Sequence, residues 1–433
     1  MTTLGTRSRP GTSWQPLLTD ASAERAMRIV REIEETLLDL PSGGPADGSL
    51  VSGDAGIALF HGYLARSVAG GADAGRVRLE RAVETLATTR LPPDLYGGFT
   101  GIAWAVEHLK AHDPGEADLN EAIDDAIEEG FRVESGASWL QRFELLSGLA
   151  GLGLYALERA PRPSAVGMLE RIVRRLGEMA ERTAEGAAWR TGPEQLPSVA
   201  LRKTPDGHYN LGVAHGSPGV IAVLAQACAA GIAARDAREL LEDAVRWLRS
   251  RRLPRGPGAD FPAWIASSGS PPADRVGWCY GNPGIAVAWL LAARALGEQE
   301  WEAEALELAR KSAARPISDS RVSEACLCHG SAGNGHLFNR LFQATGDERF
   351  REAALTWFEH TVALQKPGTG LAGFESLDLD ADGREVWLGQ PGFLTGIAGI
   401  GLALLAATSP VEPAWDRLLV ASLPATQRLQ AFV

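Results

Sequence analysis

A pair of glycines separated by two residues, Gly-x-x-Gly, recurs seven times along the 433-residue chain. Each pair opens a run of mostly apolar residues, and each run is preceded by a segment with the periodicity of an amphipathic helix. In the first repeat, Met27, Val30 and Ile33 mark such a helix over residues 22–40, and residues 52–64 form the apolar run. The fold must therefore accommodate seven similar two-helix units. The pairs begin at Gly53, Gly98, Gly148, Gly216, Gly281, Gly330 and Gly396.

This alternation predicts an all-α fold, an α/α toroid with seven inner and seven outer helices. Wholly apolar helices are normally buried on every side, whereas amphipathic helices bury one face. A linear helical solenoid is the alternative, but it would cover the apolar helices less evenly and gives no reason for seven similar glycine turns. In a closed ring the seven turns lie at one end of the barrel, so residues distant in sequence meet at one mouth.

The segments outside the repeats are expected to add little to this fold. Three of these segments are long loops, and loops of that length are usually functional or carry small elements of their own. We expect a few small β-hairpins in them, one with its turn at residues 380–383. Residues 1–20 contain no apolar run and are expected to form a flexible N-terminus, with residues 21–433 as a single toroidal domain. The three long loops are residues 188–210, 251–274 and 366–390.

Composition argues against several classes of protein. The net charge of −12 disfavours a general nucleic-acid binder, whose footprint is a basic face, but is compatible with a cationic peptide as partner. We find neither a signal peptide nor the roughly 20-residue apolar stretch of a membrane span. Four cysteines in a chain of this length do not look like a disulfide framework. We therefore expect a reducing, cytoplasmic compartment, in which thiolates stay available.

Two cysteines and one histidine lie just ahead of two glycine pairs. Cys279 precedes Gly281 by two residues, and Cys328 and His329 lie directly before Gly330. Catalytic zinc is usually held by three protein ligands with one position open to water or substrate, and two thiolates plus one imidazole form such a set. The pattern predicts one Zn²⁺ per chain. The alternative is that both cysteines are buried small hydrophobic residues.

The sequence around these positions resembles the LanC lanthipeptide cyclases. The resemblance rests on three motifs in this order: residues 210–219 with His215, residues 278–281, and residues 328–330. Through the seven glycine turns it covers essentially the whole chain. It implies a toroid of seven plus seven helices, zinc at the two cysteines and one histidine named above, and thioether ring formation in a dehydrated precursor peptide. The chain is similar to the stand-alone, class I type of this family. The resemblance also implies a dehydratase and an exporter as partners, which could hold the enzyme near the membrane.

The chemistry that the resemblance implies needs a thiolate and a proton donor. Zinc would make a substrate cysteine a thiolate at neutral pH. The thiolate adds to the β-carbon of a dehydroalanine or dehydrobutyrine, and the enolate that forms is protonated at its α-carbon. His215 is the candidate that takes the thiol proton or delivers one to the enolate. Arg275 is placed to stabilise the enolate oxygen, and Tyr280 to donate a hydrogen bond. A core histidine, an ordinary loop arginine and a packing tyrosine are the structural alternatives.

Glu144 occupies the position where the resembled family usually carries an aspartate that orients the catalytic histidine. Its extra methylene changes the reach of the carboxylate. We interpret Cys326 as structural, because an extended Cys-x-Cys-His run points it away from a metal that Cys328 binds. Cys228 falls in an inner apolar helix and is expected in the core. The other histidines lack a partner motif and are poorer candidates; they are His61, His108, His112, His208, His336 and His360.

Two functions share the predicted zinc site. The first is a zinc-dependent lanthipeptide cyclase, and the second is a LanC-like zinc protein that binds glutathione or a modified peptide without cyclising it. Loss of His215 or Arg275 should abolish turnover in the first and be better tolerated in the second. A toroidal glycosidase or prenyl-transferring enzyme would also fit the fold, but we find neither the paired acids nor the diphosphate-binding motifs that it requires.

Overall fold

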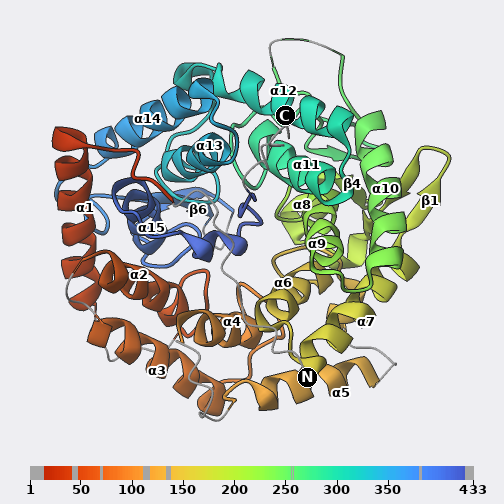
Figure 1. Ribbon diagram of the computed structural model, residues 1–433, viewed down its shortest axis with the longest axis horizontal. Coiled ribbons are helices and arrows are strands. Elements are labelled where there is room, and N and C mark those ends of the chain that lie inside the picture. Colours follow the sequence, from red (N-terminus) through yellow and green to blue (C-terminus); the bar gives the residue numbers. More distant parts are fainter. Residues whose placement is uncertain are drawn as a thin grey trace, which may run out of the picture.

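The computed structural model describes residues 14–40, 47–68, 72–110, 118–132, 138–254, 256, 258–379 and 383–424. Within these residues the helices form a closed double ring (Figure 1), which confirms the predicted α/α toroid. The outer helices are α1 (Asp20–Leu38), α3 (Ala72–Thr88), α5 (Glu121–Arg132), α7 (Pro163–Met179), α10 (Ala234–Ser250), α12 (Gln299–Ala313) and α14 (Glu348–Ala363). The inner helices are α2 (Asp54–Ser67), α4 (Phe99–Leu109), α6 (Leu149–Arg159), α9 (Ser217–Ala230), α11 (Asn282–Leu296), α13 (Ser331–Thr345) and α15 (Ile397–Thr408).

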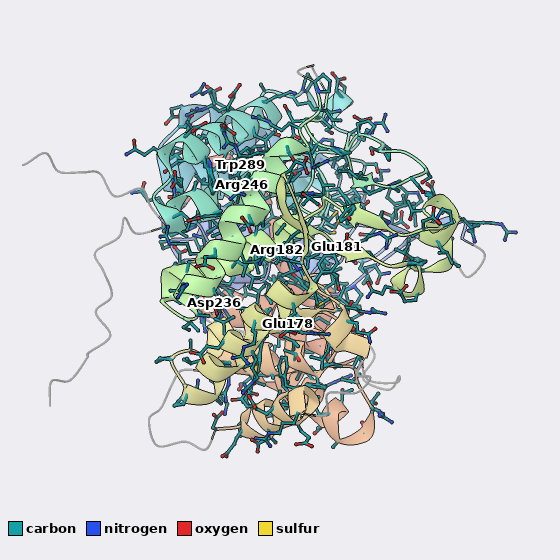
Figure 2. The ribbon with its side chains drawn as sticks, turned by 90° about the vertical axis from the view of Figure 1, so that its right-hand side faces the viewer. Glu178, Glu181, Arg182, Asp236, Arg246 and Trp289 are labelled. Carbon is teal, nitrogen blue, oxygen red and sulfur yellow. The ribbon has the colours of Figure 1, made fainter. Side chains whose placement is uncertain are left out.

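Burial follows the alternation of the sequence. In α11 every residue from Asn282 to Ala293 is buried, whereas α10 buries a single stripe that includes Leu241, Val245 and Leu248. Figure 2 shows the side of the ring, where Glu178, Asp236 and Arg246 belong to the outer helices α7 and α10. None of the described helices is both long enough and apolar enough to cross a lipid bilayer.

The last inner helix closes the ring and binds the start of the described chain. Helix α15 contacts both α1 and α2. The indole of Trp14 donates to the carbonyl of Ala406 at 2.7 Å, and the N–H groups of Leu17 and Leu18 donate to Ala407. Of the segment that the sequence predicted as a flexible N-terminus, residues 14–20 therefore pack against the toroid. Residues 1–13 lie outside the described part of the chain.

The second glycine of every pair lies against its own turn. A Cβ atom at Gly101, Gly333 or Gly399 would lie 1.9 Å from the carbonyl oxygen six residues earlier. In the other four pairs this distance would be 2.1–2.4 Å. Carbon and oxygen atoms cannot approach so closely, so the turn accepts glycine alone at this position.

Backbone hydrogen bonds also join most of the turns to their neighbours around the mouth, the end of the barrel where the seven turns lie. Six of the seven adjacent pairs are linked in this way. Among the described residues, no backbone–backbone hydrogen bond joins the turn that carries His215 to the turn that carries Cys279. The linked pairs are Leu394–Val51, Val51–Tyr96, Tyr96–Leu146, Leu145–Ala214, Cys279–Cys328 and Cys328–Leu394, with N···O distances of 3.0–3.3 Å.

Short strands and helical turns occupy the long loops. Strands β1 (Glu181–Thr183) and β2 (Gly186–Ala188) form one antiparallel pair, and β6 (Ser376–Leu379) and β7 (Glu385–Leu388) form another. The second pair confirms the hairpin predicted around residues 380–383, of which residues 380–382 lie outside the described part. Strand β4 (His208–Asn210) lies between β3 (Arg190–Thr191) and β5 (Trp264–Ile265), so it joins two distant loops. The remaining elements are α8 (Ser198–Lys203) and the 3₁₀ turns η1 (Ser138–Gln141), η2 (Pro193–Gln195), η3 (Ile317–Asp319) and η4 (Ala414–Arg417).

Replacement of a turn glycine by alanine should destabilise the folded protein, whereas replacement of a glycine within an outer helix should not. We expect Gly101→Ala to lower the free energy of unfolding by about 2 kcal/mol, because its Cβ would meet the carbonyl of Leu95. Gly167→Ala is the matched control. Its Cβ would meet only the end of the Arg171 side chain, at 3.5 Å, so helix α7 should gain about 0.5–1 kcal/mol. Urea unfolding of both variants measures the difference, and equal effects would contradict this account of the turns.

Candidate metal and catalytic site

Three side chains from two adjacent turns converge at the mouth. The ligand atoms of Cys279, Cys328 and His329 all lie within 4.8 Å of one another, and Cys279 Sγ is 3.9 Å from His329 Nδ1. The backbone bond from Cys279 to Cys328 holds the two turns at this separation. Both thiols are buried and the imidazole is partly exposed. Two sulfurs and one imidazole nitrogen are a donor set that could hold one metal ion.

A buried carboxylate fixes the imidazole of this group. His329 Nε2 lies 2.9 Å from Glu324 Oε1, and the Glu324 side chain is only 1% exposed. The other oxygen of Glu324 accepts from the N–H of Leu377 at 3.2 Å, so the carboxylate is itself held. Histidines that bind metals usually donate their second ring N–H to a carboxylate in this way. The contact leaves Nδ1 facing Cys279.

The pKa values of the Cys279 and Cys328 thiols are shifted in opposite directions. A hydrogen bond from Cys328 lowers the pKa of Cys279 well below its usual value, and the charges of His329 and Arg275 act in the same direction. The same hydrogen bond raises the pKa of Cys328. The guanidinium of Arg275 has no hydrogen-bond or ion-pair partner among the described residues, so its charge remains available at this site. Cys326 lies outside the group of three, with its sulfur within 4.8 Å of ligand atoms of Glu324 and His329.

The longer side chain of Glu144 does reach His215. Glu144 Oε2 lies 3.0 Å from His215 Nδ1, and the carboxylate also accepts from the N–H groups of Leu146 and Ser147 and from the Ser147 hydroxyl. Burial alone would lower the pKa of His215, but the hydrogen bond and charge of Glu144 outweigh it, and the pKa is raised. The imidazole is 47% exposed. Since a carboxylate can only accept, Nδ1 carries a proton and Nε2 is the free ring nitrogen.

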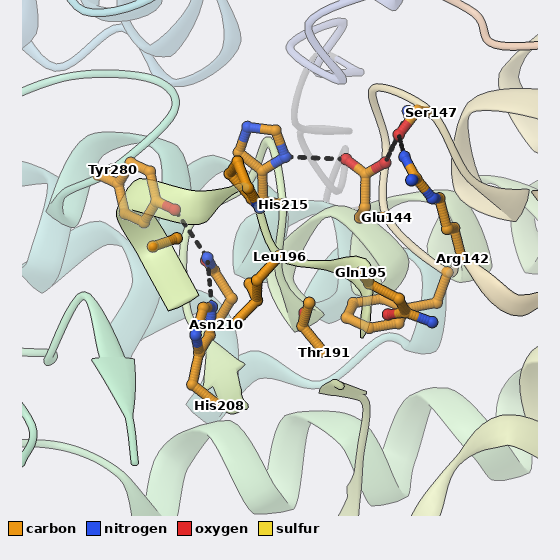
Figure 3. Close-up of a pocket in the computed structure, with 13 residues that line it drawn as sticks. Arg142, Glu144, Ser147, Thr191, Gln195, Leu196, His208, Asn210, His215 and Tyr280 are labelled. Carbon is orange, nitrogen blue, oxygen red and sulfur yellow. Dashed lines mark hydrogen bonds and ion pairs between the residues drawn. The ribbon is translucent and has the colours of Figure 1, made fainter. Parts of the chain in front are cut away.

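A cavity of about 290 Å³ opens beside this pair (Figure 3). We call it the mouth cavity. Its polar lining includes Glu144, His208, Asn210, His215 and Tyr280, and its apolar lining includes residues from the loop that carries α8. The Tyr280 hydroxyl accepts a hydrogen bond of 2.7 Å from Asn210 Nδ2. Three of the four predicted non-metal residues therefore line one cavity, and Arg275 does not.

Several groups at the mouth were not predicted. Strand β4 brings His208 and Asn210 into the cavity wall, and Glu324 holds the imidazole of His329. Burial and the negative charge of Glu144 raise the pKa of Asp94, on the neighbouring turn, to about 6. One indication of these residues was present in the sequence, namely that Asn210 is the first residue of the motif that contains His215. The other histidines set aside in the sequence lie away from this cavity, apart from His112, which lies outside the described residues.

The chain matches one family of proteins over most of its length. The family described as "Lanthionine synthetase C-like protein" matches residues 44–420, and the chain belongs to it. Nisin biosynthesis protein NisC of Lactococcus lactis subsp. lactis is 24% identical over 297 residues, which are 63% of this chain and 69% of that protein. A solved structure titled "Nisin cyclase" aligns with a TM-score of 0.73 at 19% identity, over 92% of this chain and 97% of that chain, which confirms the fold.

Removal of the Glu144 charge should lower the pKa of His215. In Glu144→Gln the burial that opposes protonation remains and the carboxylate that favours it is lost. An NMR titration of the His215 ring protons measures the shift, with Glu239→Gln, on the exposed face of α10, as control. The ion pair of His215 and Glu144 contributes most to the free energy of unfolding at a pH below the ordinary histidine pKa. This contribution is lost as the pH rises through the raised pKa of His215 in the folded protein. An unchanged His215 pKa in Glu144→Gln would contradict the assignment.

Proposed function

We propose that this protein is a zinc-dependent lanthipeptide cyclase that adds cysteine thiols of a dehydrated precursor peptide to its dehydroalanine or dehydrobutyrine residues. The observation that carries the proposal is the meeting, at one mouth, of a two-thiol, one-imidazole group with the His215–Glu144 pair. Membership in the lanthionine synthetase C-like family and the likeness to NisC support it.

Cys279, Cys328 and His329 would hold one Zn²⁺. The group fits zinc because its two sulfurs and one nitrogen leave a position for a further ligand, and because Glu324 already fixes the imidazole. When bound, zinc would supply the Lewis acidity that makes a peptide cysteine a thiolate at neutral pH.

The remaining residues would transfer the proton and stabilise the negative charge that develops on the substrate. Glu144 holds Nδ1 of His215, so Nε2 takes the thiol proton or returns one to the α-carbon after the carbon–sulfur bond forms at the β-carbon. No group leaves, because the electron pair of the double bond ends in the new carbon–hydrogen bond. Arg275 would oppose the charge on the enolate oxygen, and Tyr280 would donate a hydrogen bond to the substrate.

The substrate sets the partners that we propose. A peptide containing dehydro residues must come from a dehydration reaction, so a dehydratase acts before this enzyme. We propose that the dehydratase, and an exporter of the finished peptide, bind the protein in the cytoplasm. The mouth cavity is the entry for the peptide segment that is cyclised.

Substitutions at the mouth should divide into two groups. Cys279→Ala and His329→Ala should lose stoichiometric zinc and all ring formation, because each removes a ligand. His215→Ala should keep zinc and slow ring formation by roughly 100-fold or more. Metal analysis, and mass spectrometry of the peptide after thiol alkylation, measure both. Unchanged rates in His215→Ala would remove His215 from the mechanism. Absence of ring formation by the unaltered protein would favour the alternative, a zinc protein that binds glutathione or a modified peptide without cyclising it.

Glu324 should affect zinc without being a ligand. Glu324→Gln weakens the acceptor of the His329 N–H while keeping its shape, so zinc affinity should fall by roughly 10- to 100-fold. Competition with a fluorescent chelator measures the affinity. Glu375→Gln, at an acid in the neighbouring loop, is the control and should leave it unchanged. Wild-type affinity in Glu324→Gln would exclude this role.

A further inference from the structure

We propose that Asn210 and His208 fix the direction of the Tyr280 hydroxyl, so that its hydrogen points into the mouth cavity. There it donates to the carbonyl oxygen of the dehydro residue, which becomes negative when the thiolate adds. The inference rests on the proposed cyclase function and assigns two positioning residues to it.

The orientation of the Asn210 amide is determined by a backbone group. The N–H of Gly212 lies 2.8 Å from one amide atom of Asn210. A backbone N–H can only donate, so that atom is the oxygen Oδ1. The nitrogen Nδ2 is therefore the atom 2.7 Å from the Tyr280 hydroxyl oxygen. Because Nδ2 can only donate, the hydroxyl oxygen accepts this bond and its own hydrogen is left for another acceptor.

His208 contacts the Asn210 amide and supports the same orientation. Its Nε2 lies 3.4 Å from Asn210 Nδ2 and must accept, so the ring proton sits on Nδ1. Nδ1 lies 2.9 Å from the Thr204 hydroxyl, which in turn donates to the carbonyl of Ala200. His208, Thr204 and Asn210 are all buried. Burial and the nearby charge of His215 lower the pKa of His208, which keeps its ring neutral, as this network requires.

One hydrogen of the network has no acceptor. Among the described residues, nothing accepts from the Tyr280 hydroxyl. Burial raises the pKa of Tyr280, so the hydroxyl keeps this proton at neutral pH. Tyr280 lines the same cavity as His215 (Figure 3). A donor aimed at the place where negative charge develops stabilises the transition state more than the bound substrate. Such a donor therefore acts on the rate of ring closure more than on peptide binding.

The bond from Asn210 to Tyr280 could instead serve only to hold two turns together. It spans the one pair of adjacent turns that no backbone hydrogen bond joins within the described residues. A purely structural tie and a positioning role must therefore be separated by experiment.

Asn210→Asp separates them. Aspartate still accepts from the N–H of Gly212 but has no N–H of its own, so it accepts the Tyr280 hydrogen and turns it away from the cavity. We expect the single-turnover rate constant of ring closure to fall by roughly 10- to 100-fold, as in Tyr280→Phe. The dissociation constant of the dehydrated peptide should change by less than about 3-fold. His208→Phe removes the support from behind and should give a smaller loss in the same direction.

The decisive measurement combines the substitutions. In a Tyr280→Phe background, Asn210→Asp should cost less than about 2-fold, because no hydroxyl remains to be oriented. If Asn210→Asp acted through its charge or by loosening the turns, it would slow ring closure equally in the unaltered protein and in Tyr280→Phe. That result would overturn the proposal. Thermal unfolding checks that each variant folds, and His208→Phe carries the same cycle if Asn210→Asp does not fold.

Failure of this inference differs from failure of the proposed function. Loss of ring closure in His215→Ala, with normal rates in both Asn210→Asp and Tyr280→Phe, would overturn the inference alone. If the unaltered protein closes no ring in a dehydrated peptide, the cyclase function itself is wrong and the inference falls with it.

Discussion

The close contact between each second glycine and the carbonyl six residues earlier is the constraint on which the rest of the structure depends. It makes the turn before each inner helix narrow enough for backbone hydrogen bonds to reach the next turn, as they do in six of the seven adjacent pairs within the described residues. Helix packing alone would define a ring but would leave its ends loosely arranged. Linked turns instead fix the relative positions of side chains that lie far apart in sequence, such as Glu144 and His215 or Cys279 and Cys328.

The site uses both the linked and the unlinked turns. Cys279 and Cys328 lie on turns that share a backbone bond, so the spacing of the two sulfurs is set by the ring itself. His215 and Tyr280 lie on the two turns that, within the described part of the chain, no backbone hydrogen bond joins, and the mouth cavity opens beside them. The group of three candidate metal ligands thus lies on linked turns, next to the cavity at which we propose that the peptide enters. This arrangement suits the proposed cyclase, which must hold a metal in place while different peptide segments enter.

Much of this could be predicted from the sequence, because the informative residues repeat or cluster. The seven glycine pairs and the two kinds of helix specify the toroid, and Cys279, Cys328 and His329 are marked by their places before glycine pairs. Glu324 and His208 carry no such mark, since the first is a single acid without a defined spacing and the second lies on a three-residue strand paired across distant loops. Trp14, Leu17 and Leu18 are too few to form a periodic pattern, and their burial appears only once α15 has closed the ring.

The central claim is that two sulfurs and one imidazole at the mouth hold a metal with a position left for a substrate thiol. X-ray absorption spectroscopy at the zinc edge tests this most directly, on the purified protein with and without a dehydrated peptide that retains one cysteine. We predict two sulfur and one imidazole scatterer in the free protein and three sulfurs after the peptide binds. A zinc shell without sulfur, or a sulfur count that the peptide does not change, would contradict the account.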